Sequence, residues 1–333
     1  MQYKMLGNSG LTVSELCMGA MTFGRETPKD DSFKMLDIFI EAGGNFIDTA
    51  NVYSNGLSEK ILGKWLKKQA RDELVIATKV RFPMGDKPNQ SGLGRKHIVE
   101  SVEASLKRMG TDYVDVLYAH AWDYDTPLEE TLETFSTLVR QGKIRYAAVS
   151  NYGVRHLQRA ADLSRFKGYT PYIALQAKYN LMVRSPEWEL LPVCEENGIG
   201  FVVWGPLMGG WLSGRYRRGM SEPPAGRVKE AEKHDWFEKW SRYNTEATWS
   251  IIDTVLEIAQ RLGKSPAQVS LNWLLNKPNV TSIILGASKL DHLTDNLGCV
   301  GWSLGAEEMS ALDAASETDK PYPYDFLDMA KTR

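Results

Sequence analysis

Four side chains that together could move a proton stand at or just beyond the ends of three apolar stretches of this sequence. They are Asp48, Tyr53, Lys79 and His120. The stretches 45–48, 74–80 and 114–120 have the length and apolar character of buried strands. If they are parallel neighbours in one barrel, their carboxyl ends meet on one rim and bring the four side chains together.

The four side chains have complementary chemistry. A free tyrosine phenol has a pKa of about 10, which is too high for efficient proton donation near neutrality. The Lys79 ammonium would stabilise the Tyr53 phenolate and lower that pKa, and Asp48 would keep a buried Lys79 charged. His120 would donate a hydrogen bond to a carbonyl oxygen. Such a site suits a carbonyl that accepts a hydride, which must come from a cofactor because no side chain supplies one.

Each of these residues also has an ordinary structural explanation. Asp48 could cap the loop that it begins, Lys79 could lie on the surface, and Tyr53 could pack in the core. A lone histidine such as His120 is more often structural than catalytic. Their joint occurrence at three successive strand ends is harder to explain structurally, so we prefer the catalytic interpretation.

Composition limits the class of protein. The chain has 333 residues, with 40 basic and 42 acidic side chains and a formal net charge of -2. This balance argues against nucleic-acid binding, which favours a basic surface. Residues 1–7 lack the apolar core of a signal peptide, and no run is apolar enough to span a bilayer. We expect no nucleic-acid or membrane partner, and one barrel domain over 1–333 with a C-terminal tail at 318–333.

The three cysteines are Cys17, Cys194 and Cys299. Their wide spacing and odd number are typical neither of a disulfide framework nor of a zinc site. We expect three small buried side chains and no metal site. A reducing, cytoplasmic setting is the corresponding expectation.

Strand and helix patterns alternate eight times along the chain. The predicted strands cover 16–19, 45–48, 74–80, 114–120, 144–150, 173–176, 200–204 and 280–285. They are nearly continuous apolar runs, as expected where both faces of a sheet are buried, which favours a closed (α/β)8 TIM barrel. A β-hairpin within residues 4–13 would cap one end, and a long loop rich in Gly and Pro, 205–243, follows the seventh strand.

Two serines are expected at helix starts. Ser58 is placed to cap the helix that carries Ile61 and Leu62, and Ser265 precedes Pro266, a residue favoured at the first helical position. Both helices would lie on the outside of the barrel.

Two alternatives to this barrel enzyme are weaker. A doubly wound open sheet predicts a phosphate turn after the first strand, but 19–24 does not match Gly-x-Gly-x-x-Gly. A barrel glycosidase needs two opposed carboxylates about 5–10 Å apart at strand ends. The seventh strand ends in Trp204 and Gly205, with no acid there.

The chain resembles an aldo-keto reductase from about Lys4 to Ser316. The motifs that carry the resemblance are GGNFIDTANVY at 43–53, ATK at 77–79, LYAH at 117–120, VSN at 149–151, LQ at 175–176, WGPLMGG at 204–210 and LGASK at 285–289. The Pro-Leu-x-x-Gly loop and the Gly-Ala-Ser turn are similar to those of the branch that contains bacterial reductases and the potassium-channel β subunits.

The resemblance implies an NADP(H)-dependent reductase that converts an aldehyde or ketone into an alcohol. The implied tetrad is Asp48, Tyr53, Lys79 and His120, with Tyr53 as general acid. At the nicotinamide, the implied contacts are Ser150, Asn151 and Gln176 with the carboxamide and Trp204 stacked on the ring. The implied pyrophosphate contacts are Pro206, Leu207, Gly209 and Leu212. At the adenosine end they are Ser288, Lys289, Asp295 and Asn296, and Gly286 and His292 complete the predicted set.

Residue chemistry supports part of this assignment. A flat aromatic side chain at a strand end, such as Trp204, suits a nicotinamide face, although a core tryptophan is an equal alternative. Arg215 and Arg227 could add charge at the phosphates, although a solvated loop also explains them. Lys289 could bind a 2′-phosphate and favours NADP over NAD, whereas a neutral His292 would weaken that contact.

Three aromatic residues near the predicted rim are expected to form an apolar substrate pocket, with a place in the core as the alternative for each. They are Phe23, Phe82 and Trp122. The expected substrate is a small carbonyl compound or alcohol. The alternative function is a nucleotide-binding regulatory subunit with slow turnover, and a homo-oligomer is conceivable.

Overall fold

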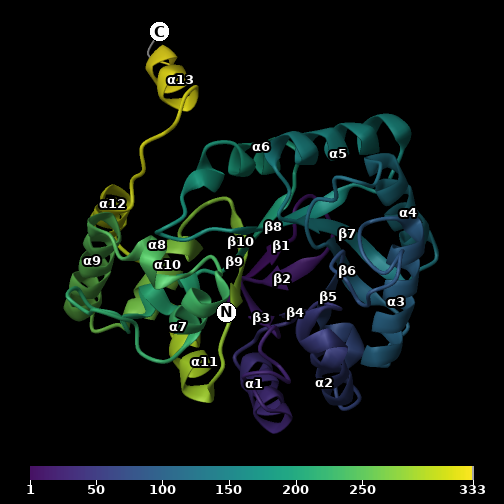
Figure 1. The fold of residues 1–333 in the computed structure, drawn as a ribbon, viewed down its shortest axis with the longest axis horizontal. Helices are drawn as coiled ribbons and strands as arrows, with labels where there is room; N and C mark the ends of the chain where they lie inside the picture. The colour runs from purple at the N-terminus through teal and green to yellow at the C-terminus, as the bar shows by residue number, and fades with distance from the viewer. Residues whose placement is uncertain (332–333) are drawn as a thin grey trace.

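The computed structural model describes residues 1–331, and at its centre is a closed barrel of eight parallel strands (Figure 1). The strands are β3 (Leu16–Gly19), β4 (Phe46–Asp48), β5 (Val75–Val80), β6 (Val114–Ala119), β7 (Ile144–Ser150), β8 (Tyr172–Lys178), β9 (Gly200–Trp204) and β10 (Val280–Leu285). They follow one another in chain order, and β10 closes the barrel against β3. The predicted (α/β)8 barrel is confirmed, and the open sheet is excluded.

Burial explains why the strands read as apolar runs. Every residue of β5 and β6 is buried, because one face of each strand packs inside the barrel and the other packs against helices. The register pairs Gly19 with Asp48, Asp48 with Ala77, and Lys79 with Tyr118. The carboxyl ends of these neighbouring strands therefore lie at one level, and the residues that follow them gather on one rim.

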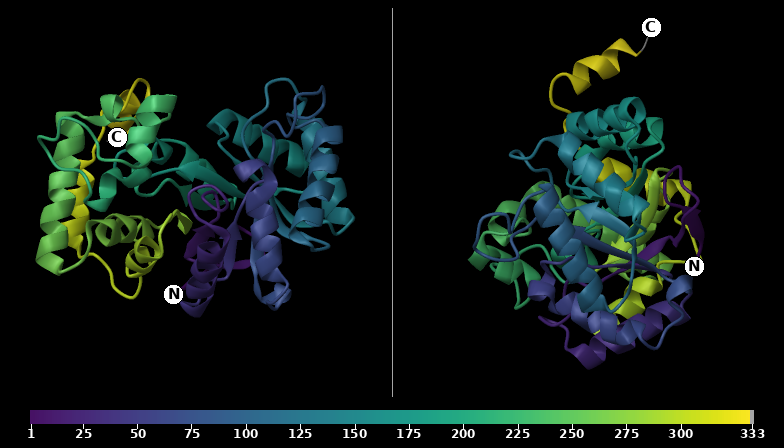
Figure 2. Two further views of the ribbon diagram at one scale, coloured as in Figure 1. Left: turned by 60° about the horizontal axis from the view of Figure 1, so that its bottom comes forward. Right: turned by 90° about the vertical axis from the view of Figure 1, so that its right-hand side faces the viewer.

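Helices surround the barrel in the views of Figures 1 and 2. The helices in the connections are α1 (Lys29–Glu41), α2 (Leu57–Leu66), α3 (Arg95–Met109), α4 (Leu128–Arg140), α5 (Val154–Lys167), α6 (Leu190–Glu196), α9 (Glu246–Leu262), α10 (Pro266–Leu275) and α11 (Leu290–Leu297). Short 3-10 turns lie at η1 (Tyr53–Gly56), η2 (Arg71–Glu73) and η3 (Ser185–Glu187).

The predicted helix start at Ser265 and Pro266 is confirmed, whereas the predicted cap at Ser58 is absent. Ser265 caps α10, because its Oγ accepts from the Gln268 N–H at 3.1 Å and its own N–H donates to the Gln268 side chain at 3.3 Å. The prediction for Ser58 is wrong, since the N-cap of α2 is Gly56. The buried Ser58 hydroxyl instead donates to the Ala20 carbonyl at 2.7 Å and ties α2 to the end of β3.

The N-terminal hairpin covers the amino-terminal end of the barrel. Strands β1 (Tyr3–Met5) and β2 (Thr12–Ser14) pair antiparallel, as predicted. Gly7, with φ of +62°, comes so close to β8 that a Cβ atom there would lie 2.2 Å from the Ile173 carbonyl oxygen. The hairpin thus closes one end and leaves the carboxyl rim open for chemistry.

The segment 205–243 is folded and is not a simple loop. It contains the 3-10 helix η4 (Met208–Ser213) and the helices α7 (Arg227–His234) and α8 (Trp240–Tyr243). The buried rings of Trp211 and Trp240 stack with their centroids 4.9 Å apart. The expectation of a long loop is corrected, because buried aromatic rings hold the segment in a defined conformation.

Two further helices end the chain, α12 (Ala306–Ala315) and α13 (Tyr324–Ala330). Helix α12 packs beside α9, whereas α13 stands away from the barrel (Figure 1 and the right-hand view of Figure 2). Tyr324 contacts Trp188, with ring centroids 5.6 Å apart. Residues 332 and 333 of the predicted tail lie outside the described residues.

The structure also bears on the predictions for the cysteines, for membrane spans and for metal sites. All three cysteines are buried and free, as predicted. Within residues 1–331, no helix is both long and apolar enough to cross a membrane. Over the same residues, no group of three or more His, Cys, Asp and Glu side chains is arranged to hold a metal ion.

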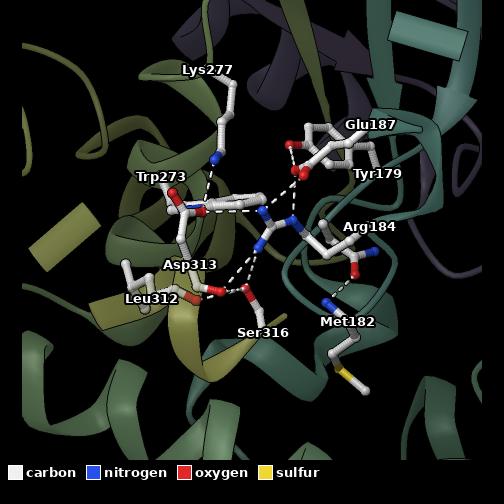
Figure 3. A network of polar contacts seen from close by, with 10 residues as sticks. Tyr179, Met182, Arg184, Glu187, Trp273, Lys277, Leu312, Asp313 and Ser316 are labelled. Atoms are coloured by element: carbon white, nitrogen blue, oxygen red, sulfur yellow. Dashed lines mark hydrogen bonds and ion pairs between the residues drawn. The ribbon is translucent and has the colours of Figure 1, made fainter. Parts of the chain in front are cut away.

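Arg184 joins the segment after β8 to α10 and α12 (Figure 3). Its guanidinium donates to both carboxylate oxygens of Glu187, at 2.5 and 2.8 Å, and to Ser316 Oγ at 2.6 Å. Asp313 of α12 lies 3.3 Å from the guanidinium and pairs at 2.7 Å with Lys277, which lies two residues past the end of α10. The Arg184 side chain is only 11% exposed. This network fastens α12 to the barrel.

The same segment supports the rim near β9. Asn180 Nδ2 donates to the Gly205 carbonyl at 2.8 Å, and Asn180 Oδ1 accepts from the Met182 N–H at 2.8 Å. Gly205 directly follows Trp204, the last residue of β9. The Arg184 network therefore stabilises a loop that helps to hold the position of Trp204.

We expect Arg184→Met to lower the free energy of unfolding by about 3 kcal/mol. The substitution preserves side-chain length but leaves the Glu187 carboxylate without its bidentate partner. Thermal or urea unfolding followed by circular dichroism measures the change. Arg218→Met is the matched control, because Arg218 pairs with Glu246 and Asp253 on the exposed surface, where ion pairs contribute little. Equal effects of the two substitutions would contradict the prediction.

Candidate active site

The ends of β4, β5 and β6 bring the four predicted side chains together. Asp48 ends β4, Lys79 is the penultimate residue of β5, Tyr53 opens η1, and His120 directly follows β6. Asp48, Lys79 and His120 are buried, and Tyr53 is partly exposed. The expected convergence on one rim is present.

Lys79 lies at the centre of this group. Its ammonium donates to the Asp48 carboxylate, to the Thr49 carbonyl oxygen at 2.9 Å and to the Tyr53 hydroxyl oxygen at 3.1 Å. These three acceptors match the three N–H donors of an ammonium. The Lys79 side chain is 0% exposed, so these contacts alone satisfy its charge.

Asp48 connects this group to the opposite wall of the barrel. Gln176 Nε2, from β8, donates to Asp48 Oδ1 at 2.9 Å, while Asp48 Oδ2 accepts from Lys79. The two oxygens are thus held from opposite sides, which fixes the orientation of the carboxylate. One of the two N–H donors of Gln176, which was predicted to bind a carboxamide, is used in this contact.

Burial and charge set the protonation states of Lys79 and Tyr53. Burial lowers the pKa of Lys79, but Asp48 and Tyr53 outweigh it, so that pKa lies above its ordinary value. Burial raises the pKa of Tyr53, and the Lys79 ammonium opposes this only in part. The prediction of a lowered pKa for Tyr53 is therefore wrong, because burial outweighs the Lys79 charge.

His120 stands beside the phenol. Its ring centroid lies 5.7 Å from that of Tyr53 and 4.8 Å from that of Phe82, both in edge-to-face arrangements. Burial, with the charges of Lys79 and Arg81, holds the pKa of His120 well below its ordinary value, so the imidazole is neutral at neutral pH. His120 Nδ1 is buried and has no hydrogen-bond partner among residues 1–331.

The four predicted nicotinamide residues form a hydrogen-bonded chain next to His120. Asn151 Nδ2 donates to the His120 carbonyl oxygen and to Ser150 Oγ, both at 3.0 Å. Trp204 Nε1 donates to Asn151 Oδ1 at 3.0 Å, and Ser150 Oγ donates to the Gln176 carbonyl at 2.9 Å. The structure therefore brings Ser150, Asn151, Gln176 and Trp204 together on the rim. The indole of Trp204 is partly exposed there.

Two cations lie close to the glycine turn that was predicted to wrap a pyrophosphate. Gly209 has a left-handed φ of 66°, which lets backbone approach a ligand closely. Glu238 pairs with Lys178 at 3.9 Å and with Arg227 at 3.7 Å. The Glu238 side chain lies close to the turn, because a Cβ atom on Gly209 would be 2.9 Å from it. Two cations beside a glycine turn fit a diphosphate, with the Glu238 carboxylate paired to both cations in this structure.

The other residues predicted at the pyrophosphate have different surroundings. Pro206 and Leu212 are buried, and Leu207 is partly exposed. Arg215 donates to the Ala225 carbonyl oxygen within the same segment. Arg215 therefore contributes to the folding of the segment in this structure.

The predicted adenosine contacts divide into an exposed and a buried group. The partly or fully exposed residues at the start of α11 are Gly286, Ser288, Lys289 and His292. Asp295 accepts from Ser265 Oγ at 2.8 Å and from Gln268 Nε2 at 3.1 Å, and Asn296 is buried. Asp295 thus fastens α10 to α11, a structural contact that the sequence did not indicate.

Two of the three predicted pocket aromatics reach the surface of the rim. Phe82 and Trp122 are partly exposed, and Trp122 stacks flat on His156 with ring centroids 3.9 Å apart. Phe23 is fully buried in the core, where its carbonyl oxygen accepts from Ser54 Oγ at 3.0 Å. The structure favours the core alternative for Phe23, because the loop after β3 folds against η1.

The sequence analysis did not single out three charged residues of this rim, namely Arg81, Lys178 and Glu238. Arg81 lies two residues past Lys79, and Lys178 lies two residues past Gln176. Since alternate side chains of a strand share a face, this spacing would have indicated both positions. Glu238 gave no such signal, because its place depends on how the segment 205–243 folds.

Comparison with known proteins agrees with the fold. Residues 15–317 match the Aldo/keto reductase family. The chain is 35% identical to the uncharacterized oxidoreductase YrpG of Bacillus subtilis (strain 168), over 94% of this chain and 95% of that protein.

Two further relatives cover most of the chain. It is 36% identical to a probable voltage-gated potassium channel subunit beta of Arabidopsis thaliana, over 90% of this chain and 91% of that protein. It is 32% identical to the aryl-alcohol dehydrogenase (NADP+) of Phanerodontia chrysosporium, over 95% of this chain and 86% of that protein. These relatives confirm the predicted branch and support an oxidoreductase. The chain belongs to the aldo/keto reductase family.

Proposed function

We propose that this chain is an NADPH-dependent reductase that transfers hydride to the carbonyl of an aldehyde or ketone and yields an alcohol, with Tyr53 as general acid. The observation that carries the proposal is the 3.1 Å hydrogen bond from the Lys79 ammonium, held by Asp48, to the Tyr53 hydroxyl. The family match and the NADP+ in the name of one dehydrogenase relative support the cofactor.

The tetrad supplies the proton. Bound NADPH supplies the hydride. The neutral His120 imidazole donates a hydrogen bond to the carbonyl oxygen, and Tyr53 gives its proton to that oxygen as negative charge develops there. The Lys79 ammonium stabilises the phenolate that Tyr53 leaves behind, and Asp48 balances the ammonium charge.

Other residues of the rim would hold the cofactor. Trp204 would cover one face of the nicotinamide, with Ser150 and Asn151 at its carboxamide. Gly209 would cradle the diphosphate between Lys178 and Arg227. The fit of two cations beside a left-handed glycine supports this assignment. Lys289, exposed at the start of α11, would bind the 2′-phosphate.

We further propose that the chain is a single barrel domain that works in the cytoplasm. Three buried, unpaired cysteines are typical of a reducing compartment and support this setting. A regulatory subunit is the second candidate function, because the chain is 36% identical to a probable potassium channel subunit beta. Tight NADPH retention with very slow turnover of every carbonyl in a broad panel would favour that candidate.

We expect Tyr53→Phe to lower kcat for an activated aromatic aldehyde by at least about 100-fold, because the phenol proton is lost. NADPH binding, followed by fluorescence, should stay unchanged. Stopped-flow or steady-state oxidation of NADPH measures the rate. Tyr113→Phe is the matched control, since Tyr113 precedes β6 at the far end of the barrel. Aldehyde reduction by Tyr53→Phe at the wild-type rate would overturn the assignment.

The pH profile of kcat for reduction should be flat from about pH 6.5 to about pH 10. The raised pKa of Tyr53 keeps the donor protonated up to the alkaline limit, and the lowered pKa of His120 keeps the imidazole neutral down to the acid limit. The profile is measured as the initial rate of NADPH oxidation at saturating NADPH and aldehyde, in buffers of constant ionic strength. An alkaline limb with an apparent pKa below about 9 would contradict the burial argument for Tyr53.

We expect Lys289→Met to weaken NADPH binding at least about tenfold, because a charge-assisted contact to the 2′-phosphate is lost. Binding of NADH, which lacks that phosphate, should change little. Fluorescence titration of both cofactors gives the two dissociation constants. Lys107→Met, on the exposed face of α3, is the control for loss of one positive charge. A parallel loss of NADPH and NADH affinity would exclude this role for Lys289.

A further inference from the structure

Arg81 lies at the mouth of the barrel and has no role in the tetrad. It directly follows β5, two residues beyond Lys79, so strand alternation directs its side chain to the same side as the catalytic ammonium. Its guanidinium lies 5.3 Å from the ring of Phe82, and that ring lies 4.8 Å from the His120 imidazole. Arg81 is therefore one aromatic ring away from the group that would orient the carbonyl.

The charge of Arg81 is not paired within residues 1–331. Its guanidinium makes no hydrogen bond or ion pair there, and its Nε atom is buried without a partner. Other partly buried arginines are paired: Arg71 binds Asp115 at 2.7 Å, and Arg108 binds Glu59 at 2.6 Å. A partly buried guanidinium without a paired carboxylate has its donors available for an anion.

Asp123 is not that anion. Its carboxylate is already committed, because it accepts from the Leu93 N–H at 2.6 Å, the Thr126 hydroxyl at 2.7 Å and the Asp125 N–H at 3.2 Å. The positive charge of Arg81 helps to lower the pKa of Asp123, but the two side chains form no ion pair. The guanidinium therefore stays free to bind an anionic ligand.

Barrel topology indicates which ligand this is. In the strand order, β5 and β9 are four strands apart in either direction, so Arg81 follows the wall opposite to the one that carries Trp204. The residues that would hold the cofactor lie on β7 to β10 and the segments that follow them. The β5 side of the rim, with Phe82 and Trp122 from the loops after β5 and β6, is left for the substrate.

We propose that Arg81 anchors a carboxylate of the substrate, so that the preferred substrates are carbonyl compounds with a carboxylate across a short or aromatic spacer. A guanidinium fork binds both oxygens of a carboxylate in one plane, which fixes the orientation of the carbonyl beside His120. The partly exposed rings of Phe82 and Trp122 suit an aromatic spacer. This inference rests on the proposed reductase function.

The test compares an acid with its uncharged ester. The probes are 4-carboxybenzaldehyde and methyl 4-formylbenzoate, which share one skeleton and one reacting carbonyl. Wild type should reduce the acid with the higher kcat/KM. Arg81→Met should lower kcat/KM for the acid by about 10- to 100-fold and leave the ester within about threefold, and Arg81→Lys should lie between. Arg95→Met, a surface arginine paired with Glu133, should match wild type.

The ratio of kcat/KM for the acid to kcat/KM for the ester isolates the anchoring role of Arg81. Removing Arg81 also removes a positive charge near His120, but this affects acid and ester equally. An equal loss for both probes, or a wild-type preference for the ester, would overturn the proposal. Arg81→Lys should recover part of the acid preference, which a purely steric role would not produce.

A binding measurement separates this inference from the proposed function. Titration calorimetry of 4-(hydroxymethyl)benzoate with wild type and Arg81→Met, with and without NADP+, needs no turnover. Binding at least about tenfold weaker in Arg81→Met supports the anchor. If wild type reduces no aldehyde yet this difference persists, the reductase proposal fails and the anion site stands. Equal affinities would remove the anion site.

Discussion

A lysine ammonium with no exposed surface is the constraint on which the rest of this site depends. Charge is expensive inside a protein unless every donor is matched, and Lys79 has three acceptors for its three protons. Those acceptors come from β4 and the residues just after it. They are in reach because the parallel register sets Asp48 opposite Ala77, two residues before Lys79. Strand register is therefore the physical origin of the tetrad.

The buried charge sets the electrostatics of its neighbours. Both carboxylate oxygens of Asp48 already accept hydrogen bonds, one from Lys79 and one from Gln176 across the barrel. Asp48 is therefore a weak acceptor for a ligand. Burial, with the charges of Lys79 and Arg81, lowers the pKa of His120 and keeps it neutral. In the proposed reaction, this positive charge would lie near the carbonyl oxygen on which negative charge develops.

The two halves of the rim are built differently. On the β4 to β6 side, short contacts within a few residues of the strand ends hold the catalytic groups. On the β8 to β10 side, the positions of Trp204 and Gly209 depend on distant supports, including Asn180 and the Arg184 network that reaches α12. Under the proposed function, the first side would hold the proton donor and the second would hold the cofactor.

The sequence by itself determined the elements and the residues at their ends. Eight buried strands were predicted because apolar runs and turn residues are local signals, and the tetrad was predicted because polar residues at the carboxyl ends of such strands must meet on one rim. The start of α10 at Ser265 and Pro266 was predicted for the same local reason. The family resemblance added roles for Ser150 and Lys289 that spacing alone did not supply.

Only the tertiary structure decided the properties that sum over distant neighbours. The pKa of Tyr53 lies above its ordinary value because burial outweighs Lys79, and burial cannot be read from a motif. The contact between Asp48 and Gln176 spans 128 positions of the chain. The burial of Phe23, the helices within 205–243 and the unpaired charge of Arg81 likewise depend on which segments fold against one another. Local pattern specifies elements, whereas desolvation and pairing are properties of the assembled barrel.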